Sequence, residues 1–149
     1  GIYFFLYTYL YGDFLTIFNV YNNYMDKVID GIDLSGQKTL HGLTLEQFYV
    51  LMKHQEFKCA LSGFKFRYCD ERKKYLDYQY PNGKKQKAPA IDHDHETGLI
   101  RGILSERVNQ LTDQWHKWKA YGKLSEPKEL IEYRKHPPAF ECIGKVYFK

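Results

Sequence analysis

The chain has 149 residues, of which 44% are hydrophobic and 27% charged, the balance of a soluble globular protein with one compact domain or a small domain plus an extension. Its formal net charge of +4 is compatible with a polyanionic partner but does not indicate one by itself. The three cysteines, Cys59, Cys69 and Cys142, include no CxxC pair and exclude a paired disulfide framework, which favours a reducing compartment.

The N-terminal segment is rich in aromatic residues. Ile2 to Phe18 is strongly apolar, but Asp13 interrupts it, and the uninterrupted part is shorter than the roughly 20 apolar residues that span a bilayer. Because no basic region precedes it and no small-residue cleavage site follows, we expect neither a membrane role nor a signal peptide. We expect a core or subunit contact, made by an aromatic hairpin turning near residues 11–13 or by an amphipathic helix. Residues 31–42 carry Gly, Ser and Asp without apolar periodicity, which predicts a linker.

A helix is predicted to begin at Thr44. The Thr44 hydroxyl can accept the backbone N–H three residues on, and Gln47 stands where a capping box has its reciprocal side chain. Apolar residues then recur with the i, i+3, i+4, i+7 spacing of one helical face, namely Leu45, Phe48, Tyr49 and Met52. The helix should end near His54 or Gln55.

A β-hairpin is predicted after this helix. Residues 59–63 (CALSG) are typical of a tight turn, and residues 64–68 alternate apolar and basic side chains, as a half-buried strand does. Residues 75–80 are the expected partner strand, closing at residues 81–83. A basic loop follows, with Lys84, Lys85 and Lys87. Its side chains form either a solvated charge run or a contact with phosphate.

Two short strands come next, at residues 88–93 and 99–104, separated by the turn at residues 95–98. Ser105 can cap a following helix. The apolar seam of that helix has spacings of three, four and three, at Val108, Leu111, Trp115 and Trp118. It should stop at residues 121–122, and a last helix should begin after residue 125 and end before the proline pair at 137–138.

Asp92, His93, Asp94 and His95 put two carboxylates and two imidazoles in four consecutive residues. Hydrolysis of a phosphodiester needs a base for water and a cation for the developing charge. Imidazole suits the first task because its usual pKa lies near neutrality. Carboxylate and amide oxygens suit a hard cation such as Mg²⁺, and Asn109, in the first turn of the next helix, is well placed to bring a second oxygen.

These four residues alone do not identify a catalytic site. The same pattern fits an exposed acidic turn with incidental histidines, or a simple metal-binding tract. It also meets a geometric difficulty, because neighbouring side chains of a regular strand point to opposite faces. Asp92 and His93 therefore share a site only if the strand ends or twists between them, which the turn that follows makes plausible.

The run of residues 91–104 (IDHDHETGLIRGIL), followed by Asn109, closely resembles the recombination endonuclease VII family of phage-type His-Me finger (HNH-type) nucleases. Residues 43–48 and 59–63 resemble that family's lead-in, and residues 133–138 resemble its end. The resemblance implies an α+β fold with a ββα-metal (His-Me finger) core and flanking helices. To these, the sequence patterns described above add an inserted β-hairpin and an aromatic-rich N-terminal extension.

The expected organisation has three parts. Residues 1–42 would be the N-terminal extension and linker, residues 43–140 the His-Me finger nuclease domain, and residues 141–149 a C-terminal tail. The resemblance covers the second part.

By position, the resemblance implies that Asp92 and Asn109 bind one divalent cation, Mg²⁺ or Mn²⁺. His93 would be the general base that activates water. His95 would be a supporting catalytic residue that orients the site or contacts the scissile phosphate. Arg101 would either contact phosphate or form a structural salt bridge.

The remaining polar residues receive lesser roles. The other candidates for DNA contact are Lys84, Lys85 and Lys87. Asp94 is expected to face away from the site and to stabilise the turn. The isolated histidines are assigned to surface or packing: His41, His54, His116 and His136.

The family normally holds a structural zinc with four cysteines. The corresponding positions here are Cys59, Ser62, Ser105 and Val108. Hydroxyl and isopropyl groups cannot complete a tetrahedral thiolate site, and Cys69 would fill only one vacancy. We therefore expect no structural zinc, with Cys59 as a small buried residue and with the tryptophan seam and the hairpin at 64–80 supplying core.

The sequence thus predicts a metal-dependent DNA endonuclease that cuts branched DNA, such as Holliday junctions, or duplex DNA at chosen sites. A junction resolvase needs two active sites, so the N-terminal segment could supply a homodimer contact. The alternative is a catalytically silent nuclease-like module that binds DNA or protein in a larger assembly, which the missing zinc ligands support. We expect no membrane partner and a cytoplasmic location, in a phage-infected host cell.

Overall fold

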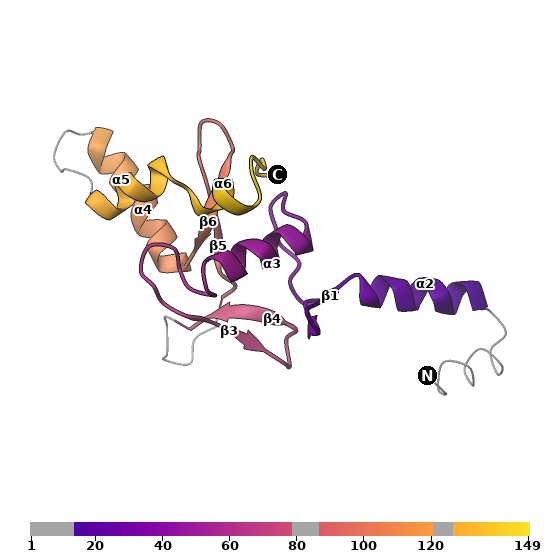
Figure 1. Ribbon diagram of the computed structural model, residues 1–149. Helices are drawn as coiled ribbons and strands as arrows, with labels where there is room; N and C mark the ends of the chain where they lie inside the picture. Colours follow the sequence, from indigo (N-terminus) through magenta and orange to yellow (C-terminus); the bar gives the residue numbers. More distant parts are fainter. Residues whose placement is uncertain (1–13, 79–86, 121–126) are drawn as a thin grey trace.

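The computed structural model describes residues 14–78, 87–120 and 127–149, which form helices and two-stranded antiparallel sheets (Figure 1). The helices are α2 (Phe14–Met25), α3 (Leu45–His54), α4 (Glu106–Ala120), α5 (Lys128–Lys135) and α6 (Pro138–Cys142). The strands are β1 (Val28–Ile29), β2 (Ile32–Asp33), β3 (Phe66–Cys69), β4 (Lys74–Asp77), β5 (Ala90–His93) and β6 (Ile100–Leu104). The predicted mixed α+β class is confirmed.

Helix α2 stands away from the rest of the chain (Figure 1). Of the two alternatives predicted for the N-terminal segment, residues 14–25 adopt the helix, and residues 11–13 lie outside the described residues. Four of its apolar side chains are 45% to 63% exposed: Phe18, Val20, Tyr21 and Met25. None of its described side chains belongs to the hydrophobic core. None of the helices in the described ranges has the length and apolar character needed to cross a bilayer.

Residues 31–42 are built into the fold, so the interpretation of this segment as a mere linker is wrong. Leu34 is fully buried in the hydrophobic core, and Gln37 Oε1 accepts a hydrogen bond of 3.0 Å from the Tyr75 backbone N–H. Gly36 lies so close to the Arg72 carbonyl that a Cβ would overlap it. Close backbone packing selects the same small residues as a flexible linker does, so composition did not distinguish the two.

Helix α3 begins and ends as predicted. Thr44 Oγ1 accepts the Gln47 backbone N–H at 3.1 Å, and Gln47 Oε1 accepts the Thr44 backbone N–H at 2.9 Å, which completes the capping box. Gln55 is the C-cap residue. The helix buries Phe48, Tyr49, Leu51 and Met52. Leu45 is partly buried against the same core.

The hairpin predicted after α3 is present. Strands β3 and β4 pair antiparallel around a turn at residues 70–73. The hairpin buries Phe66, Tyr75 and Leu76, each at most 5% exposed. Its contribution to the core is therefore confirmed, whereas residues 81–83, where closure was predicted, lie outside the described part of the chain.

Strands β5 and β6 form an antiparallel hairpin that leads directly into α4, in the predicted order. Two acceptors fix the start of α4. Ser105 Oγ accepts the Val108 backbone N–H at 3.3 Å, and Oδ2 of the buried Asp77 accepts the Glu106 backbone N–H at 3.0 Å. A carboxylate at this end also interacts favourably with the helix dipole, so β4 and β6 together determine where α4 begins.

The predicted apolar seam of α4 is only partly observed. Val108 packs against the core, but Leu111 is 43% exposed. The side chains of Trp115 and Trp118 lie outside the described residues, as do residues 121–122, where the helix was predicted to stop.

Helix α5 lies where the last helix was predicted, but α6 follows it. Pro138 occupies the start of α6, a position where proline is tolerated because its missing N–H has no helical partner. The proline pair predicted a stop, so α6 was not expected from the sequence. Helix α6 packs on α3 and β6, and Glu141 Oε2 lies 2.8 Å from His54 Nε2 of α3.

After α6 the chain returns to the β5–β6 hairpin. We call residues 143–149 the docked tail. Tyr147 forms an antiparallel bridge with Leu99, and the Ile100 backbone N–H donates to the Val146 carbonyl at 2.9 Å. The docked tail thus pairs with the outer edge of β6, beside the turn that carries the predicted site.

Candidate active site

The end of β5 is irregular at the point where the site was predicted. Asp92 pairs with Gly102, but His93 pairs with Ile100, so the register shifts between two consecutive residues. The strand ends at His93. A bulge of this kind re-aims the side chains next to it, and the predicted end of regular strand geometry between Asp92 and His93 is confirmed.

The Asp92 carboxylate is buried against two donors. Arg101 donates from Nε to Oδ2 at 2.9 Å and from Nη2 to Oδ1 at 3.1 Å, and the Tyr133 hydroxyl donates to Oδ2 at 2.9 Å. Asp92 is 2% exposed and the Arg101 side chain 11%. Arg101 Nη2 also donates to the His93 carbonyl at 3.0 Å. One guanidinium therefore fixes both the carboxylate and the backbone of the next residue.

The Tyr133 contact depends on a glycine in β6. A Cβ on Gly102 would lie 2.9 Å from the Tyr133 hydroxyl oxygen and 3.2 Å from its Cε2. Burial raises the pKa of Tyr133 well above its usual range, and the Asp92 charge adds to the shift. Burial therefore favours the protonated phenol, which donates its hydrogen bond to Asp92.

His93 lies between another histidine and a phenylalanine from the docked tail. Its ring is stacked on Phe148 with centroids 3.7 Å apart and planes at 18°, and the His95 ring lies 4.9 Å away. Burial, assisted by His95, lowers the pKa of His93, while the Asp92 charge acts in the opposite direction. The neutral imidazole, which can accept a proton, is favoured at neutral pH.

His95 is exposed and forms a pair with α4. Its Nε2 lies 3.0 Å from Asp113 Oδ1. Both line a cavity of about 190 Å³ together with the guanidinium-bearing residues Arg101 and Arg134. Asp94 and Glu96, from the turn of the hairpin, complete the lining. The cavity therefore presents both cationic and anionic groups beside the His93–His95 pair.

Asp94 stabilises the turn, as expected, but the expectation that it faces away from the site is wrong, because Asp94 lines the cavity beside His95. Its Oδ1 accepts the backbone N–H groups of Glu96 at 2.8 Å and Thr97 at 3.0 Å. These hydrogen bonds lower the pKa of Asp94, since they favour its charged form. Asp94 thus has a structural role in the loop between β5 and β6.

Asn109 lies in the first turn of α4. Its backbone N–H donates to the Ser105 carbonyl at 2.9 Å, and the two caps described above hold this turn in place. Helix α4 contacts β5, the strand that carries Asp92. The fold thus brings the helix with the amide to the strand with the carboxylate.

The donor chemistry of Asp92 and Asn109 suits a hard divalent cation. A carboxylate offers about four acceptor positions, and three of those on Asp92 are taken by Arg101 and Tyr133. One position on Oδ1 is left, enough for a single bond to a cation. Among the described residues, no group of three or more His, Cys, Asp and Glu could hold a metal ion. A site with few protein ligands is usual for Mg²⁺, which keeps several waters.

Of the two alternatives for Arg101, the structural salt bridge is present, and a contact with phosphate stays a prediction. Lys84 and Lys85 lie outside the described residues. The Lys87 side chain is 58% exposed, and its Nζ lies 3.9 Å from Glu106 Oε1. A role of these lysines in DNA binding also stays a prediction.

The four positions that carry zinc ligands in the resembled family have other contacts here. Cys59 is 2% exposed in the hydrophobic core, which confirms its predicted burial. Ser105 caps α4, as described above. Ser62 and Val108 line one pocket of about 310 Å³ with apolar neighbours, among them Leu61 and Leu130. The expectation that this chain holds no structural zinc stays a prediction.

Four residues of the site were not predicted from the sequence, namely Asp113, Tyr133, Arg134 and Phe148. Asp113 follows Asn109 by four residues, the spacing that puts two side chains on one helical face, so a signal for it was present. Tyr133 and Arg134 stood inside the segment that resembles the family but were given no role. Phe148 has no local signal, because it reaches His93 only through the pairing of the docked tail.

Comparison with known proteins gives one family and two relatives. The sequence profile of the family described as recombination endonuclease VII matches residues 35–136. The Gene 59 protein of Mycobacterium phage L5 is 30% identical over 105 residues, which cover 70% of this chain and 51% of that protein. The Gene 59 protein of Mycobacterium phage D29 is 27% identical with the same coverage. The chain thus spans about half the length of these curated relatives. No solved structure matches it.

Proposed function

The chain belongs to the recombination endonuclease VII family, and from this premise we propose that it is a divalent-metal-dependent DNA endonuclease. The observation that supports the proposal is the register shift between Asp92 and His93, because it frees the carboxylate and the imidazole from pointing to opposite faces of the strand. A proton acceptor and a carboxylate for a hard cation are the two groups that phosphodiester hydrolysis needs. We further propose that β5, β6 and α4 form the ββα-metal core of this family.

His93 is the proposed general base. One nitrogen of its neutral ring takes a proton from a water molecule while the water oxygen attacks phosphorus. The bond from phosphorus to the 3′ oxygen breaks, and this oxygen is protonated from solvent. The products carry a 5′-phosphate and a 3′-hydroxyl. Burial of the ring, which lowers the pKa of His93, keeps this nitrogen available at neutral pH.

Asp92 and Asn109 are the proposed cation ligands, through carboxylate and amide oxygens. When bound, Mg²⁺ or Mn²⁺ supplies positive charge that stabilises the charge developing on phosphate and on the leaving oxygen. Arg101 and Tyr133 hold the Asp92 carboxylate in one orientation. The two caps of α4 hold the helix turn that carries the amide.

His95 is proposed to support the reaction from beside the base. Its ring lies 4.9 Å from that of His93, and Asp113 orients it from α4. The adjoining cavity also contains Arg101 and Arg134. Cationic side chains attract phosphate, so this cavity is where we propose that the scissile phosphate lies.

Cleavage of supercoiled plasmid DNA tests the proposal. We expect nicked product with Mg²⁺ or Mn²⁺, none in EDTA, and a loss of about 10²-fold or more in His93→Ala. His54→Ala is the control, because this histidine lies on α3 and pairs there with Glu141, a residue outside the candidate site. Cleavage at the wild-type rate by His93→Ala would exclude His93 as the base.

A catalytically silent DNA- or protein-binding module is the second candidate. The ion pair between Arg101 and Asp92 favours it, because the guanidinium already neutralises the carboxylate that a cation would use. The same assay separates the two candidates. A silent DNA-binding module would shift DNA in a gel but would not nick it, whichever divalent metal is added.

DNA is the proposed partner, either branched or duplex. A panel of four-way junction, mismatched duplex, matched duplex and single-stranded DNA, under one metal condition, identifies the class that is cut. Preference for the junction indicates a resolvase. Cleavage of matched duplex at few positions indicates a site-specific nicking or homing endonuclease.

A homodimer through α2 is proposed as the assembly that acts on two strands. The helix exposes four large apolar side chains and stands away from the core. Removing such area from water is favourable by roughly 25 cal/mol per Å². Pairing of two copies of α2 would bury this surface and bring two sites into one particle.

A further inference from the structure

We infer that Phe148 of the docked tail is a positioning residue for His93, an inference that rests on the proposed function. Phe148 lies outside residues 35–136, the range that matches the family. Its ring is nearly parallel to the His93 imidazole, at 3.7 Å and 18°. It is also stacked on His41, with centroids 4.5 Å apart and planes at 13°. Two rings this close to a third cannot share one of its faces, so Phe148 lies between the two histidines.

The backbone holds this ring in place on both sides. The Phe148 N–H donates to the Gly98 carbonyl at 2.7 Å, and the Lys149 N–H donates to the His41 carbonyl at 3.0 Å. The tail is thus tied to the turn of the β5–β6 hairpin and to the loop before α3. Hydrogen bonds to two separate segments fix the register of the tail, and with it the height of the ring above the imidazole.

The loop that carries His41 is fitted to the same tail. His41 has φ +51° and Gly42 has φ +101°, and a Cβ on Gly42 would overlap the Tyr147 carbonyl. A non-glycine residue in this region is uncommon and persists where its surroundings hold it. Loop and tail therefore fit each other through backbone contacts as well as through the rings.

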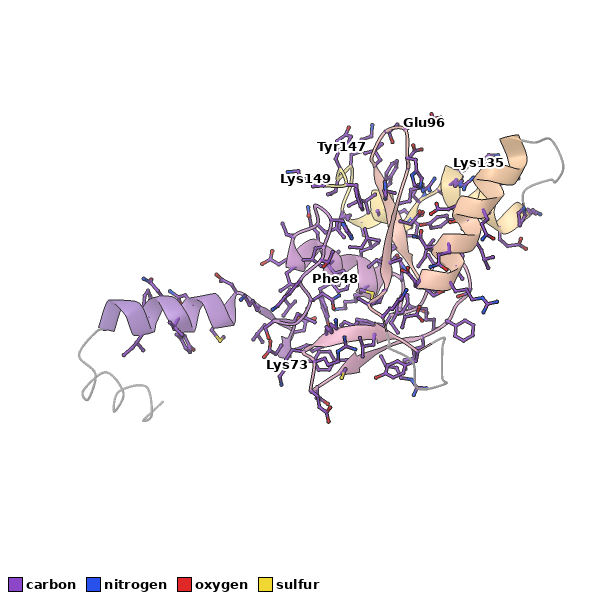
Figure 2. The ribbon with its side chains drawn as sticks, turned by 180° about the vertical axis from the view of Figure 1, so that it is seen from behind. Phe48, Lys73, Glu96, Lys135, Tyr147 and Lys149 are labelled. Atoms are coloured by element: carbon purple, nitrogen blue, oxygen red, sulfur yellow. The ribbon has the colours of Figure 1, made fainter. Side chains whose placement is uncertain are left out.

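Tyr147, the neighbour of Phe148 in the docked tail, provides a control substitution for the stack. Exposure alternates along it, as in a strand: Val146 and Phe148 are partly buried, and Lys145, Tyr147 and Lys149 are exposed. Figure 2 shows Tyr147 and Lys149 at the same end of the molecule as Glu96 of the hairpin turn. Tyr147→Ala thus removes an aromatic ring from the tail without touching the stack.

The orientation of the His93 imidazole plane should affect the rate of proton transfer, because a general base must point at the water that it deprotonates. The χ2 torsion of histidine is broad and roughly two-fold, so an imidazole without a packed face samples several orientations. Displacement of a reacting group by about 1 Å can reduce a rate by about 10²-fold. Phe148, itself packed against His41, restricts the His93 ring to one plane. The nitrogen that accepts the proton therefore has a fixed direction toward the water.

NMR tests the stack without any substrate. The imidazole carbon-bound protons of His93, assigned with His93→Gln, should be shifted upfield by the Phe148 ring. The shift should disappear in Phe148→Ala and Phe148→Leu, persist in Phe148→Tyr and Tyr147→Ala, and diminish in Gly42→Ala, which displaces the tail but keeps the ring. Phe148→Leu keeps apolar bulk in case the alanine variant does not fold. An unchanged His93 signal in folded Phe148→Leu would overturn the inference.

Kinetics test the consequence on the DNA that the panel identifies. We expect kcat to fall about 10- to 100-fold in Phe148→Ala and Phe148→Leu, with KM for DNA within about twofold and with recovery in Phe148→Tyr. A wild-type protein that cuts no DNA contradicts the proposed function and leaves the NMR result to decide the stack. A wild-type protein that cuts DNA, with Phe148→Leu equally fast, contradicts the positioning role alone.

Discussion

The Asp92 carboxylate is 2% exposed and depends on a guanidinium and a phenol for its stability. A buried charge that loses its partner keeps its desolvation penalty without compensation. Arg101 and Tyr133 come from β6 and α5, so two separate elements meet at one side chain. These two residues therefore contribute to folding as well as to the proposed chemistry.

We expect Arg101→Met to reduce the free energy of unfolding by about 3–5 kcal/mol, the usual cost of breaking a buried ion pair. Tyr133→Phe removes one hydrogen bond to the carboxylate and should cost about 1.5–3 kcal/mol. Urea unfolding followed by circular dichroism measures both. Arg107→Met is the control, since Arg107 is exposed on α4 and should change the free energy by no more than about 0.5 kcal/mol. Equal stability of the two arginine variants would contradict the role of the ion pair.

At the scale of elements, Gln55 joins helix α3 to strand β6. Its Oε1 accepts the Ile103 backbone N–H at 2.9 Å, and its Nε2 donates to the carbonyls of Ile103 at 2.8 Å and Lys58 at 2.9 Å. The side chain amide thus pairs with a buried strand residue as a neighbouring strand would. This pairing holds the strand next to Asp92 against the helix.

Gln55→Ala should cost about 2 kcal/mol, because the N–H of the fully buried Ile103 loses its acceptor. Gln110→Ala is the control, because Gln110 is exposed and its amide reaches only the Glu106 carboxylate one turn away. Thermal unfolding of the three proteins checks this expectation. A cost for Gln55→Ala no greater than for Gln110→Ala would show that the amide bridge is unimportant.

The turn between β5 and β6 should be sensitive to acid through Asp94. The pKa of Asp94 is lowered by the N–H groups of Thr97 and Glu96, so its stabilising effect is complete above the unfolded pKa of roughly 3.9. The effect is lost as pH falls through the folded pKa. Asp94→Asn, which keeps an oxygen acceptor but no charge, should be less stable than wild type at pH 7 and should approach it as the pH falls through the lowered pKa of Asp94. Urea midpoints across this pH range measure the difference, and a constant gap would contradict the assignment.

Local signals predicted the elements well, and long-range contacts escaped them. The Thr44–Gln47 capping box and the Ser105 cap are encoded within four residues, so the starts of α3 and α4 were predictable. Residues 92–95 are consecutive, so the candidate site could also be predicted from a local pattern. Leu34, Asp77 and Phe148 act through partners far along the chain, and a single sequence does not reveal such pairings.

At the scale of the whole molecule, α2 and the remainder of the chain are separable. The helix contributes no described side chain to the core, whereas Leu34 and Gln37, which follow it, are buried there. The stable unit in the described residues therefore begins between α2 and Leu34. The predicted boundary between residues 42 and 43 marks a change in sequence pattern, and it is not where the stable unit begins.

Measured at a dilution where the protein is monomeric, deletion of residues 1–25 should leave the free energy of unfolding unchanged to within about 0.5 kcal/mol, because the described side chains of α2 make no core contact. If α2 forms the proposed homodimer, light scattering should give the mass of two chains for the full protein and of one chain for the deletion variant. Deletion of residues 1–42 should unfold the protein, since it removes Leu34. A full-length monomer would contradict the dimer, and a destabilised 26–149 fragment would contradict the independence of α2.

The salt bridge between Arg101 and Asp92 has a consequence for folding without metal. Because Arg101 balances the buried charge of Asp92, we expect the chain to reach its native form without a divalent cation at this carboxylate. We expect the same melting profile after exhaustive chelation, with added Mg²⁺ raising the midpoint only by the mass-action contribution of a bound ligand. Under the proposed function, protein purified without divalent metal is folded but inactive, and addition of Mg²⁺ starts the reaction at a defined time.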